Sequence, residues 1–572
     1  MDRVLITSAL PYINGVKHLG NFAGSMLPAD VYARFQRARG RETLFICATD
    51  EHGTPAELAA SAAALDVRSY CDQQHVLQKS VCEQFGLSWD WFGRSSSSAN
   101  RRLTQQFAED LEENGLLEER VDRMLFSIDD NRFLPDRYVE GTCPYCAFDQ
   151  ARGDQCDSCG RLLDPTQLIE PYSAISKSRN LISKETRNLY LCQSRIVDRL
   201  WRWLEERKFS VLAESIARKH LNEGLRDRGI TRDLSWGIPV TRNGNPRKGF
   251  EEKVFYVWFD APIEYISATI EWSEEKHENW ERWWRLDKGA SDVKYVQFMG
   301  KDNVAFHTTS FPATLLGSGR PWKSVDNIKS FNWLNWYGDK FSTSRRRGVF
   351  MDAALQLLPA DYWRWYLISN GPENADTPFT WEHFSASVNS DLANVLGNYI
   401  NRVFKFAQSR FGAVVPRRGE DGELEENLLL QLKDGAAAIT DELENMNFRS
   451  AARRLRELWS AGNSYFNDAA PWKHVLAEPG RAAHIVYTSL VMAELLSRLS
   501  APFIPFTAAK ISAALGVNSF SVWPTPEEIA SFDTIRAGAP FSVPELLFSK
   551  ISEDQVAEWS IAFGGRARES AV

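Results

Sequence analysis

The sequence contains no long hydrophobic run, and its cysteines are few. No segment approaches the ~20 consecutive apolar residues of a membrane-spanning helix. The apolar run at the N-terminus is too short for the hydrophobic region of a signal peptide. Eight cysteines in 572 residues do not predict a disulfide scaffold. We therefore expect a soluble protein of the reducing cytoplasm that does not associate with a membrane.

The chain also lacks an excess of positive charge, internal repeats and low-complexity segments. Its net charge is −8 and its isoelectric point is about 5.8. This charge argues against a protein that coats nucleic acid non-specifically, although a local basic patch could still bind RNA. The 44% hydrophobic content, with 20 Trp and 33 Phe, is typical of well-packed globular domains. At ~150 residues per domain, the length indicates about four of them.

The sequence has no P-loop, but residues 11–21 offer another place for phosphate. They read Pro-Tyr-Ile-Asn-Gly-Val-Lys-His-Leu-Gly-Asn and lie between a strand pattern and a helical pattern. Asn14 and Gly15 favour a tight turn. His18 and Asn21 follow at the opening of the helix, where free N–H groups and the helix dipole favour phosphate. The segment predicts a cradle for a nucleoside triphosphate, and taken alone it is a weak signal.

A second polar and basic run, residues 340–348, follows a strand pattern late in the chain. It reads Lys-Phe-Ser-Thr-Ser-Arg-Arg-Arg-Gly. His-Leu-Gly-Asn at residues 18–21 and Lys-Phe-Ser-Thr-Ser at residues 340–344 resemble the two signatures of class I aminoacyl-tRNA synthetases. These signatures are usually written His-Ile-Gly-His and Lys-Met-Ser-Lys-Ser. Together, the two signatures support a nucleotide-binding site much more strongly than either one does alone.

Four of the eight cysteines form two Cys-x-x-Cys knuckles. The knuckles are Cys143–Cys146 and Cys156–Cys159, and each turns two thiolates toward one centre. Four thiolates at ~2.3 Å suit a closed, tetrahedral Zn²⁺ site, which leaves no open position for catalysis. We therefore predict one structural zinc ion per chain. An iron–sulfur cluster or a redox pair is the remaining alternative.

Strand and helix patterns alternate in the first part of the chain, cease, and then return. This order predicts one parallel α/β sheet, Rossmann-like, that is interrupted by an inserted zinc-knuckle domain. Residues 254–259 and 295–299 read as strands of the returning pattern. Beyond about residue 376, apolar spacings of three and four predict an all-α bundle that continues nearly to the end.

Four further segments resemble those of methionyl-tRNA synthetases. They are Ala9-Leu10-Pro11-Tyr12, residues 49–54 (Thr-Asp-Glu-His-Gly-Thr), residues 255–263 (Phe-Tyr-Val-Trp-Phe-Asp-Ala-Pro-Ile), and residues 300–303 with Phe306-His307. The knuckles sit where that family carries its zinc insertion, and the resemblance runs in order from residue 3 to about residue 564. The spelling of the two signatures looks more like the archaeal and eukaryotic branch of the family than the commonest bacterial one.

The resemblance implies a domain plan and a two-step reaction. The methionine carboxylate attacks the α-phosphate of ATP, and the acyl group then moves to the terminal adenosine of a tRNA for methionine. Such a reaction needs positioning and charge stabilisation, with Mg²⁺ on the ATP, rather than a covalent enzyme intermediate. The implied domains are 1–115 and 233–325 (catalytic), 116–232 (connective, with the knuckles), 326–385 (stem contact), 386–550 (anticodon binding) and 551–572 (tail).

Residue roles are also implied by the matching positions. Catalytic roles fall to His18, Asn21, Lys340 and Thr343, and ATP contacts to these four together with Tyr12, Asn14, Gly15 and Gly20. Asp50 would bind the substrate ammonium with Arg232 as its ion-pair partner. The methionine pocket would consist of Ala9, Leu10, Tyr12, Trp258, Ala261, Pro262, Tyr265 and His307. Aromatic walls suit a thioether, although from composition alone Trp258 and Tyr265 would be read as core residues.

Anticodon recognition is implied for Asn398, Arg402 and Trp472. The first two are four residues apart and so share one helix face. An exposed aromatic can stack on an unpaired base for ~1–3 kcal/mol. The alternative for each is an ordinary capping or core residue. The arginines of residues 449–456 could contact the RNA backbone, but a solvated helix face is the better reading.

Two departures from the family pattern lie in the signatures. Asn21 replaces a histidine, which keeps a donor without the possibility of charge. Thr343 replaces the second lysine of Lys-Met-Ser-Lys-Ser, and Arg345, Arg346 or Arg347 could supply the missing charge. The alternative is that these arginines face solvent or the tRNA.

Competing functions are a synthetase for valine, isoleucine or leucine, a zinc-stabilised interaction module, and a catalytically weakened, synthetase-like RNA-binding or regulatory protein. The stretch between the sheet halves is too short to hold both an editing insertion and the knuckles. An interaction module leaves the two signatures unexplained, and only Thr343 favours lost catalysis. We expect a methionine–tRNA ligase that charges initiator and elongator tRNA. We also expect a monomer, since the chain lacks the C-terminal extension that dimerises some relatives.

Overall fold

A parallel five-stranded sheet forms the centre of the catalytic half. The computed structural model describes residues 2–154, 156, 158–159, 161, 163–341 and 347–563. The strand order is β16-β15-β1-β2-β3, and every neighbouring pair is parallel. The strands are β1 Arg3–Ser8, β2 Glu42–Thr49, β3 Trp91–Arg94, β15 Val293–Gly300 and β16 Asn327–Phe331. The predicted Rossmann-like sheet is present, with its halves separated in sequence by an insertion.

The two faces of this sheet belong to two different cores. In β1, Val4 and Ile6 join a cluster that contains α2, whereas Leu5 joins a cluster that contains α9. This alternation is the period of two expected of a strand covered on both sides. The helices of this half are α1 Leu19–Asn21, η1 Phe22–Met26 (π), α2 Leu27–Ala38, α3 Thr54–Ala62, α4 Val67–Gln84, α5 Ser98–Glu113, α8 Val257–Asp260, α9 Glu264–Lys276, α10 Glu281–Trp284, α11 Val304–Thr308 and α12 Ser310–Gly317.

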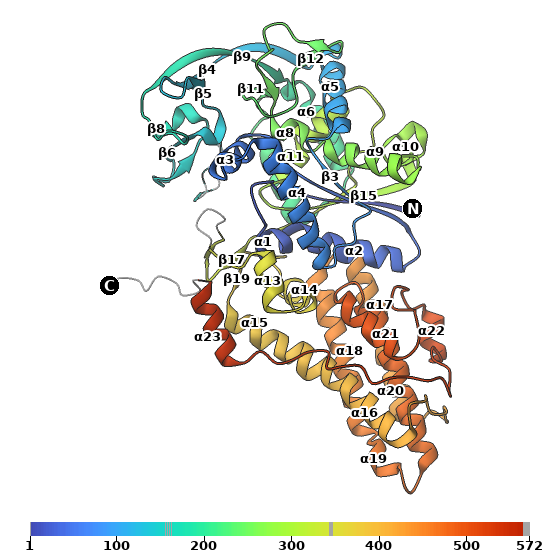
Figure 1. Cartoon of the computed structure of the whole chain (residues 1–572). Helices are drawn as coiled ribbons and strands as arrows, with labels where there is room; N and C mark the ends of the chain where they lie inside the picture. The colour runs from blue at the N-terminus through green and yellow to red at the C-terminus, as the bar shows by residue number, and fades with distance from the viewer. Residues whose placement is uncertain are drawn as a thin grey trace.

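The insertion is a long antiparallel ribbon with a small sheet at its end. Strands β4 and β9 pair over their whole length and arch above the sheet in Figure 1. The elements are β4 Leu117–Ser127, β5 Arg132–Phe133, β6 Val139–Thr142, β7 Ala151–Arg152, β8 Ile169–Ser173, β9 Leu181–Leu191, β10 Arg228–Gly229, α6 Val197–Glu205 and α7 Val211–Asn222. Strands β6, β7 and β8 form a separate antiparallel sheet beside the cysteine knuckles.

The strand predicted at residues 254–259 is wrong. Only Val254–Phe255 (β14) is extended, and it pairs antiparallel with β11, Thr231–Arg232, outside the main sheet. Residues 257–260 instead form α8, in which Val257, Phe259 and Asp260 are buried. A short apolar run cannot distinguish a buried strand from a buried helix, which explains the error. A short hairpin, β12 Thr241–Arg242 with β13 Asn245–Pro246, precedes this region.

The second half of the chain is a helical bundle that extends away from the sheet (Figure 1). A three-stranded sheet, β17 Leu334–Trp336, β18 Asp339–Lys340 and β19 Thr377–Phe379, marks the junction. The helices are α13 Met351–Leu357, α14 Ala360–Ser369, α15 Trp381–Val388, η7 Asn389–Gly397 (π), α16 Asn398–Phe411, α17 Glu423–Glu444, α18 Phe448–Asp468, α19 Pro471–His474, α20 Pro479–Ser500, α21 Pro505–Ala514, α22 Pro526–Ser531 and α23 Glu553–Ala562. Its apolar residues belong to the same core cluster as Val4 and Ile6 of the sheet.

Helices continue to Ala562, nearly the end, as the sequence predicted, with one long irregular segment between α22 and α23. Residues 532–552 contain no helix or strand and run back along the bundle. Gly538, Pro540 and Pro544 interrupt helical hydrogen bonding there. The segment is fixed by its contacts, since Ile551 N donates to the Asn389 side chain (2.8 Å). In the described part of the chain, no helix is long and apolar enough to span a membrane.

A buried arginine joins the two halves. Arg364 of α14 and Asp30 of α2 are both fully buried, and their side chains are 2.7 Å apart. The same guanidinium donates to the carbonyls of Phe85 (3.2 Å), Pro502 (2.9 Å) and Phe503 (2.9 Å). It therefore links helices on the sheet, the junction and the turn that follows α20.

Removing Arg364 should destabilise the whole molecule. Arg364→Ala leaves Asp30 and three carbonyls buried without donors, so it should lower the free energy of unfolding by about 3–5 kcal/mol in urea titration. Arg34→Ala is a matched control, because Arg34 also bonds Asp30 (2.9 Å) but is partly exposed. Its effect should be clearly smaller. Equal effects of the two substitutions would contradict the assignment of Arg364 as the linking residue.

Candidate active site and anticodon end

The two signature segments meet at one place. The His18 ring stacks on Phe341 with centroids 4.8 Å apart and planes at 16°. His18 also forms a backbone bridge with Phe350, on the other side of the second signature. Residues 342–346, which include Thr343, Arg345 and Arg346, lie outside the described residues. The first signature and the start of the second are thus in direct contact, although more than 300 residues separate them in sequence.

His18 is held as a neutral donor at the start of α1. Its Nδ1 accepts the backbone N–H of Asn21 (3.3 Å). Burial, with nearby Lys17, lowers the pKa of His18 to about 3. The ring is therefore neutral at pH 7, and because Nδ1 accepts, the proton is on Nε2. A Cβ at Gly20 would lie 3.0 Å from His18 Nδ1, so glycine there leaves room for the ring.

The turn before His18 is held in place by hydrogen bonds from Gln78 of α4. Gln78 donates its side-chain amide to the carbonyls of Tyr12 (3.1 Å) and Gly15 (3.0 Å). Gly15 has a φ of +122°, a conformation that favours glycine. Asn14 accepts from the Lys17 ammonium (2.9 Å), and burial lowers the pKa of Lys17 to about 7. Lys17 and Gln78 were not singled out from the sequence as site residues.

Asp50 is a buried carboxylate with an unused acceptor. It follows β2 and forms a parallel backbone bridge with Tyr12, which follows β1. Its side chain is buried, and Oδ1 has no hydrogen-bond partner among the described residues. Burial, and then the carboxylates of Asp260 and Glu51, raise the pKa of Asp50 well above its usual value. Such a group would be stabilised by a cationic ligand.

Aromatic side chains lie near Asp50, and burial together with the Asp50 charge raises the pKa of the Tyr12 and Tyr265 hydroxyls. Trp258 Nε1 donates to the Tyr12 hydroxyl (2.9 Å), and Trp258 packs on Phe306 at 4.2 Å. Tyr265 and His307 Nε2 are 3.0 Å apart, and His307 Nδ1 is 2.9 Å from the Asn303 carbonyl. Because a carbonyl can only accept, Nδ1 carries the proton and Tyr265 donates to Nε2. Burial lowers the pKa of His307 to about 4, which fits this neutral form.

The smaller residues of the predicted pocket belong to the same elements. Ala9 and Leu10 follow β1 and are half-buried against the core that contains Tyr265. Ala261 and Pro262 follow α8 directly, next to Trp258. The fold thus collects this set from the ends of β1 and β2 and from α8, α9 and α11.

The predicted ion pair between Arg232 and Asp50 is wrong. Arg232 instead pairs with Asp136 at 3.1 Å and lies over the Tyr256 ring at 3.9 Å. Asp136 comes from the insertion, so the arginine joins the insertion to the start of α8. The sequence could not show this, because nothing in the local pattern around Asp136 marked it as a partner.

A hydrogen-bonded pair next to Asp50 also escaped the sequence analysis as a site feature. His52 Nδ1 lies 2.7 Å from Asp260 Oδ2, and both residues are buried. His52 stands within residues 49–54, and Asp260 within residues 255–263. Both segments were recognised as motifs, so the signal was present although no role was assigned.

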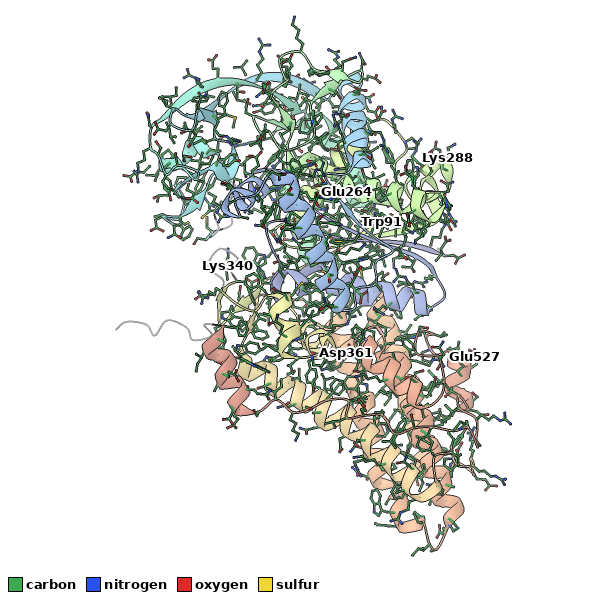
Figure 2. The ribbon with its side chains drawn as sticks, in the orientation of Figure 1. Trp91, Glu264, Lys288, Lys340, Asp361 and Glu527 are labelled. Atoms are coloured by element: carbon green, nitrogen blue, oxygen red, sulfur yellow. The ribbon has the colours of Figure 1, made fainter. Side chains whose placement is uncertain are left out.

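Lys340 stands on the flank where the insertion approaches the junction (Figure 2). Its ammonium is 3.4 Å from the Ser158 carbonyl of the second knuckle and 4.3 Å from the Trp333 ring centre. Arg347, the one described arginine of the run, pairs with Asp339. This pairing disfavours Arg347 as the substitute for the missing lysine.

The four knuckle cysteines form one cluster. The sulfur atoms of Cys143, Cys146, Cys156 and Cys159 all lie within 4.8 Å of one another. Four thiolates at ~2.3 Å from a tetrahedral zinc ion would be ~3.8 Å apart, and Cys146 and Cys156 are 3.6 Å apart. Two of the cysteines are buried and two are exposed. The cluster fits a structural zinc ion and leaves no position for a substrate.

Arg402 and Trp472 lie together at the far end of the bundle, and Asn398 stands one helical turn before Arg402. Arg402 of α16 is 5.9 Å from the ring of Trp472 in α19, which Figure 1 places at the tip. Trp472 is 45% exposed, although it contacts Phe406 and Phe466. Asn398 and Arg402 donate to Asn463 (3.3 Å) and Asn467 (2.7 Å) of α18. One aromatic face and two donors are therefore presented side by side.

Comparison with known proteins gives matches over nearly the whole chain. Residues 4–404 match the model of class I tRNA synthetases (M), and residues 415–568 match that of the anticodon-binding domain of methionyl tRNA ligase. The chain is 62% identical to a methionine–tRNA ligase of Caulobacter vibrioides over 99% of this chain and 100% of that protein. It is 58% identical to one of Maricaulis maris, over 99% of each. These relatives are bacterial, whereas the spelling of the signatures resembles the archaeal and eukaryotic branch.

A solved structure shares the fold. The Mycobacterium tuberculosis methionyl-tRNA synthetase in complex with methionyl-adenylate has a TM-score of 0.76 and 21% identity. The match covers 96% of this chain and 100% of that one.

The cysteine cluster predicts a measurable metal content. Pure protein should contain about one zinc ion per chain, and Cys143→Ser should release it and destabilise the insertion. Metal analysis with thermal unfolding checks both. Cys192→Ser, a buried cysteine outside the cluster, is the control and should retain the metal. Protein without any tetrahedral metal would contradict the assignment.

Proposed function

The chain belongs to the class I tRNA synthetase family that is specific for methionine, and we propose that the residues around Asp50 and His18 form its active centre. The protein is a methionine–tRNA ligase, since its relatives with that activity match it along its whole length. It activates methionine with ATP and transfers the acyl group to a tRNA for methionine. The proposals below concern which residues do so.

Asp50 binds the ammonium group of methionine. The observation that carries this proposal is its buried Oδ1, which lacks a donor among the described residues. An ammonium group supplies donors and a positive charge, and both favour the ionised carboxylate. Bound methionine therefore lowers the pKa of Asp50. Affinity for methionine should increase with pH as this carboxyl ionises.

The thioether of methionine lies among the aromatic residues. Tyr12 and Trp258 form one wall through their hydrogen bond, and Tyr265 with neutral His307 forms another. Sulfur–aromatic contacts contribute ~0.3–1.5 kcal/mol each. Ala9, Leu10, Ala261 and Pro262 complete the pocket with small or apolar surfaces. Arg232 is bound to Asp136 and is not assigned to the amino group.

ATP binds along the first signature. His18 donates from Nε2, and the N-terminus of α1 offers the backbone N–H group of Gly20 to the phosphates. Tyr12, Asn14 and Gly15 form the turn beside them. Lys340 adds a positive charge from the second signature, and Mg²⁺ arrives with ATP. The role of Thr343 stays a prediction from the sequence, because Thr343 is outside the described residues.

Anticodon reading takes place at the tip of the bundle. Trp472 stacks on an unpaired base, and Asn398 and Arg402 donate to base edges. Initiator and elongator tRNAs for methionine carry the same anticodon, so the enzyme charges both. The zinc ion keeps the insertion folded. We further propose that the protein acts as a cytoplasmic monomer.

Replacing Asp50 should lower activity without lowering stability. Asp50→Asn keeps the size of the side chain and removes its charge, so kcat/KM for methionine in pyrophosphate exchange should fall about 10- to 150-fold, the equivalent of ~1.5–3 kcal/mol. A raised pKa in the fold means that the ionised group opposes folding at neutral pH. The variant should therefore melt no lower than the parent at pH 7.5. Asp129→Asn, on the surface, is the control, and parallel loss of activity and melting temperature would contradict the proposal.

Replacing Trp472 should affect tRNA and not the adenylate. Trp472→Ala should lower kcat/KM for tRNA charging by the equivalent of ~1–3 kcal/mol. Pyrophosphate exchange without tRNA should barely change, because Trp472 lies at the far end of the bundle. Trp472→Phe should retain part of the effect, and Leu476→Ala, at a 96% exposed neighbour, should behave as the parent. Equal loss of both steps in Trp472→Ala would indicate a packing role.

A further inference from the structure

Trp333 stands directly before β17 and carries two lysine side chains on its ring. The ammonium groups of Lys301 and Lys340 each lie 4.3 Å from the ring centre. Lys301 follows β15 at the carboxyl end of the main sheet, whereas Lys340 ends β18 and begins the second signature. One indole ring therefore joins the sheet to the segment that contacts ATP. Neither the methionine pocket nor the ATP contacts proposed above include Trp333.

The register of the β17–β18 hairpin explains why Lys340 lies on this ring. Asn335 is paired with Lys340 across the hairpin. Trp333 comes two residues before Asn335, so it is the diagonal neighbour of Lys340 on the same face. A long side chain can reach such a neighbour, and the face of an indole ring attracts an ammonium group.

The turn of this hairpin has an unfavourable backbone that contacts from the bundle hold in place. Tyr337 and Gly338 have φ values of +47° and +85°, as a two-residue type I′ turn requires. Tyrosine rarely adopts this conformation, so it persists only where its surroundings fix it. The Tyr337 hydroxyl accepts the Trp381 N–H (3.1 Å) at the start of α15 and donates to Glu382 (2.9 Å). The position of the hairpin is thus fixed relative to the bundle.

Asp376 fixes Trp333 and Lys301 to each other. Its Oδ1 accepts the backbone N–H of Trp333 (2.9 Å) and the Lys301 ammonium (2.7 Å). Burial alone would raise the pKa of Asp376, but Lys301, the Trp333 N–H and Lys340 lower it. The ionised carboxylate compensates for the repulsion between two ammonium groups on one ring. The indole N–H donates to Asp302 (3.4 Å), so the ring is anchored at both its backbone and its edge.

We propose that Trp333 is a positioning residue for the activation of methionine, and that its anchored ring sets where the Lys340 ammonium lies. The proposal rests on the proposed function, which gives Lys340 its contact with the phosphates of ATP. A lysine side chain has many rotamers, and the ring favours those that place the ammonium on its face. Less order then has to be created when the phosphates become charged in the transition state. The placement of Lys340 matters more in this chain, because Thr343 replaces the second lysine of the signature.

The first experiment removes the ring. Trp333→Leu, in the full-length protein, should lower kcat/KM for ATP in pyrophosphate exchange about 3- to 30-fold, the range for a lost cation–π contact. The KM for methionine should stay at the parent value. Trp333→Phe keeps an aromatic face and should recover part of the loss. Trp201→Leu is the matched control, because Trp201 of α6 also carries a cation over its ring (Arg218, 5.9 Å); it should exchange as the parent does.

The second experiment tests whether Trp333 acts through Lys340. In a Lys340→Ala background, Trp333→Leu should cause no further loss of exchange. A further loss of the same size would show that the ring contacts the nucleotide itself and would overturn the proposal. Parent rates in Trp333→Leu alone would also overturn it, as would a raised KM for methionine with a lowered melting temperature, which indicates packing. If Lys340→Ala itself exchanges at the parent rate, the proposed ATP contact of Lys340 is wrong, which is a different result from these.

Discussion

The buried pair of Arg364 and Asp30 is the interaction on which the arrangement of this molecule depends. A guanidinium without solvent exposure is tolerated only where acceptors surround it, and Arg364 has a carboxylate and three carbonyls. These acceptors come from α2, from the end of α4 and from the turn between α20 and α21. Burial alone would raise the pKa of Asp30, yet Arg34 and Arg364 lower it to about 2. The pair therefore stabilises the fold above about pH 4 and ceases to do so as the pH falls toward 2.

The active centre follows the opposite principle. Asp50 is a buried carboxyl with an unpartnered oxygen, Lys17 is a buried ammonium bonded to the Asn14 side chain, and burial keeps His18 and His307 neutral. The charged forms of Asp50 and Lys17 oppose folding and are favoured by a ligand of opposite charge, whereas the neutral histidines oppose folding only at acidic pH. The stable junction around Arg364 compensates for this, because a strongly packed core can carry several unfavourable groups at one end of the sheet.

Much of the fold was predictable from local patterns. The strand after residue 3 and the long helices of the bundle follow their apolar periodicity to within a few residues. The strand predicted at residues 254–259 was wrong because the apolar periodicity of a short buried run does not distinguish a strand from a helix. Residues 532–552, for which no particular helix was predicted, are irregular, in keeping with Gly538, Pro540 and Pro544.

The candidate site was predictable only where motifs carried it. The positions of Asp50, Trp258, Tyr265 and His307 came from segments that resemble a family, and the structure places them together. Partners across the chain were not accessible in this way. Arg232 meets Asp136 of the insertion rather than Asp50. Such contacts depend on tertiary packing, which no local spacing encodes.

Because sheet and bundle share one core, the distance between the tip of the bundle and the end of the sheet is fixed. Trp472 at the tip and Asp50 at the sheet belong to parts that cannot hinge freely, because one apolar cluster and Arg364 run between them. A nucleic acid that touches both places must span a fixed separation, and any mismatch has to be taken up by distortion of the RNA. Selection among tRNAs then includes their stiffness, a property that no single base contact measures.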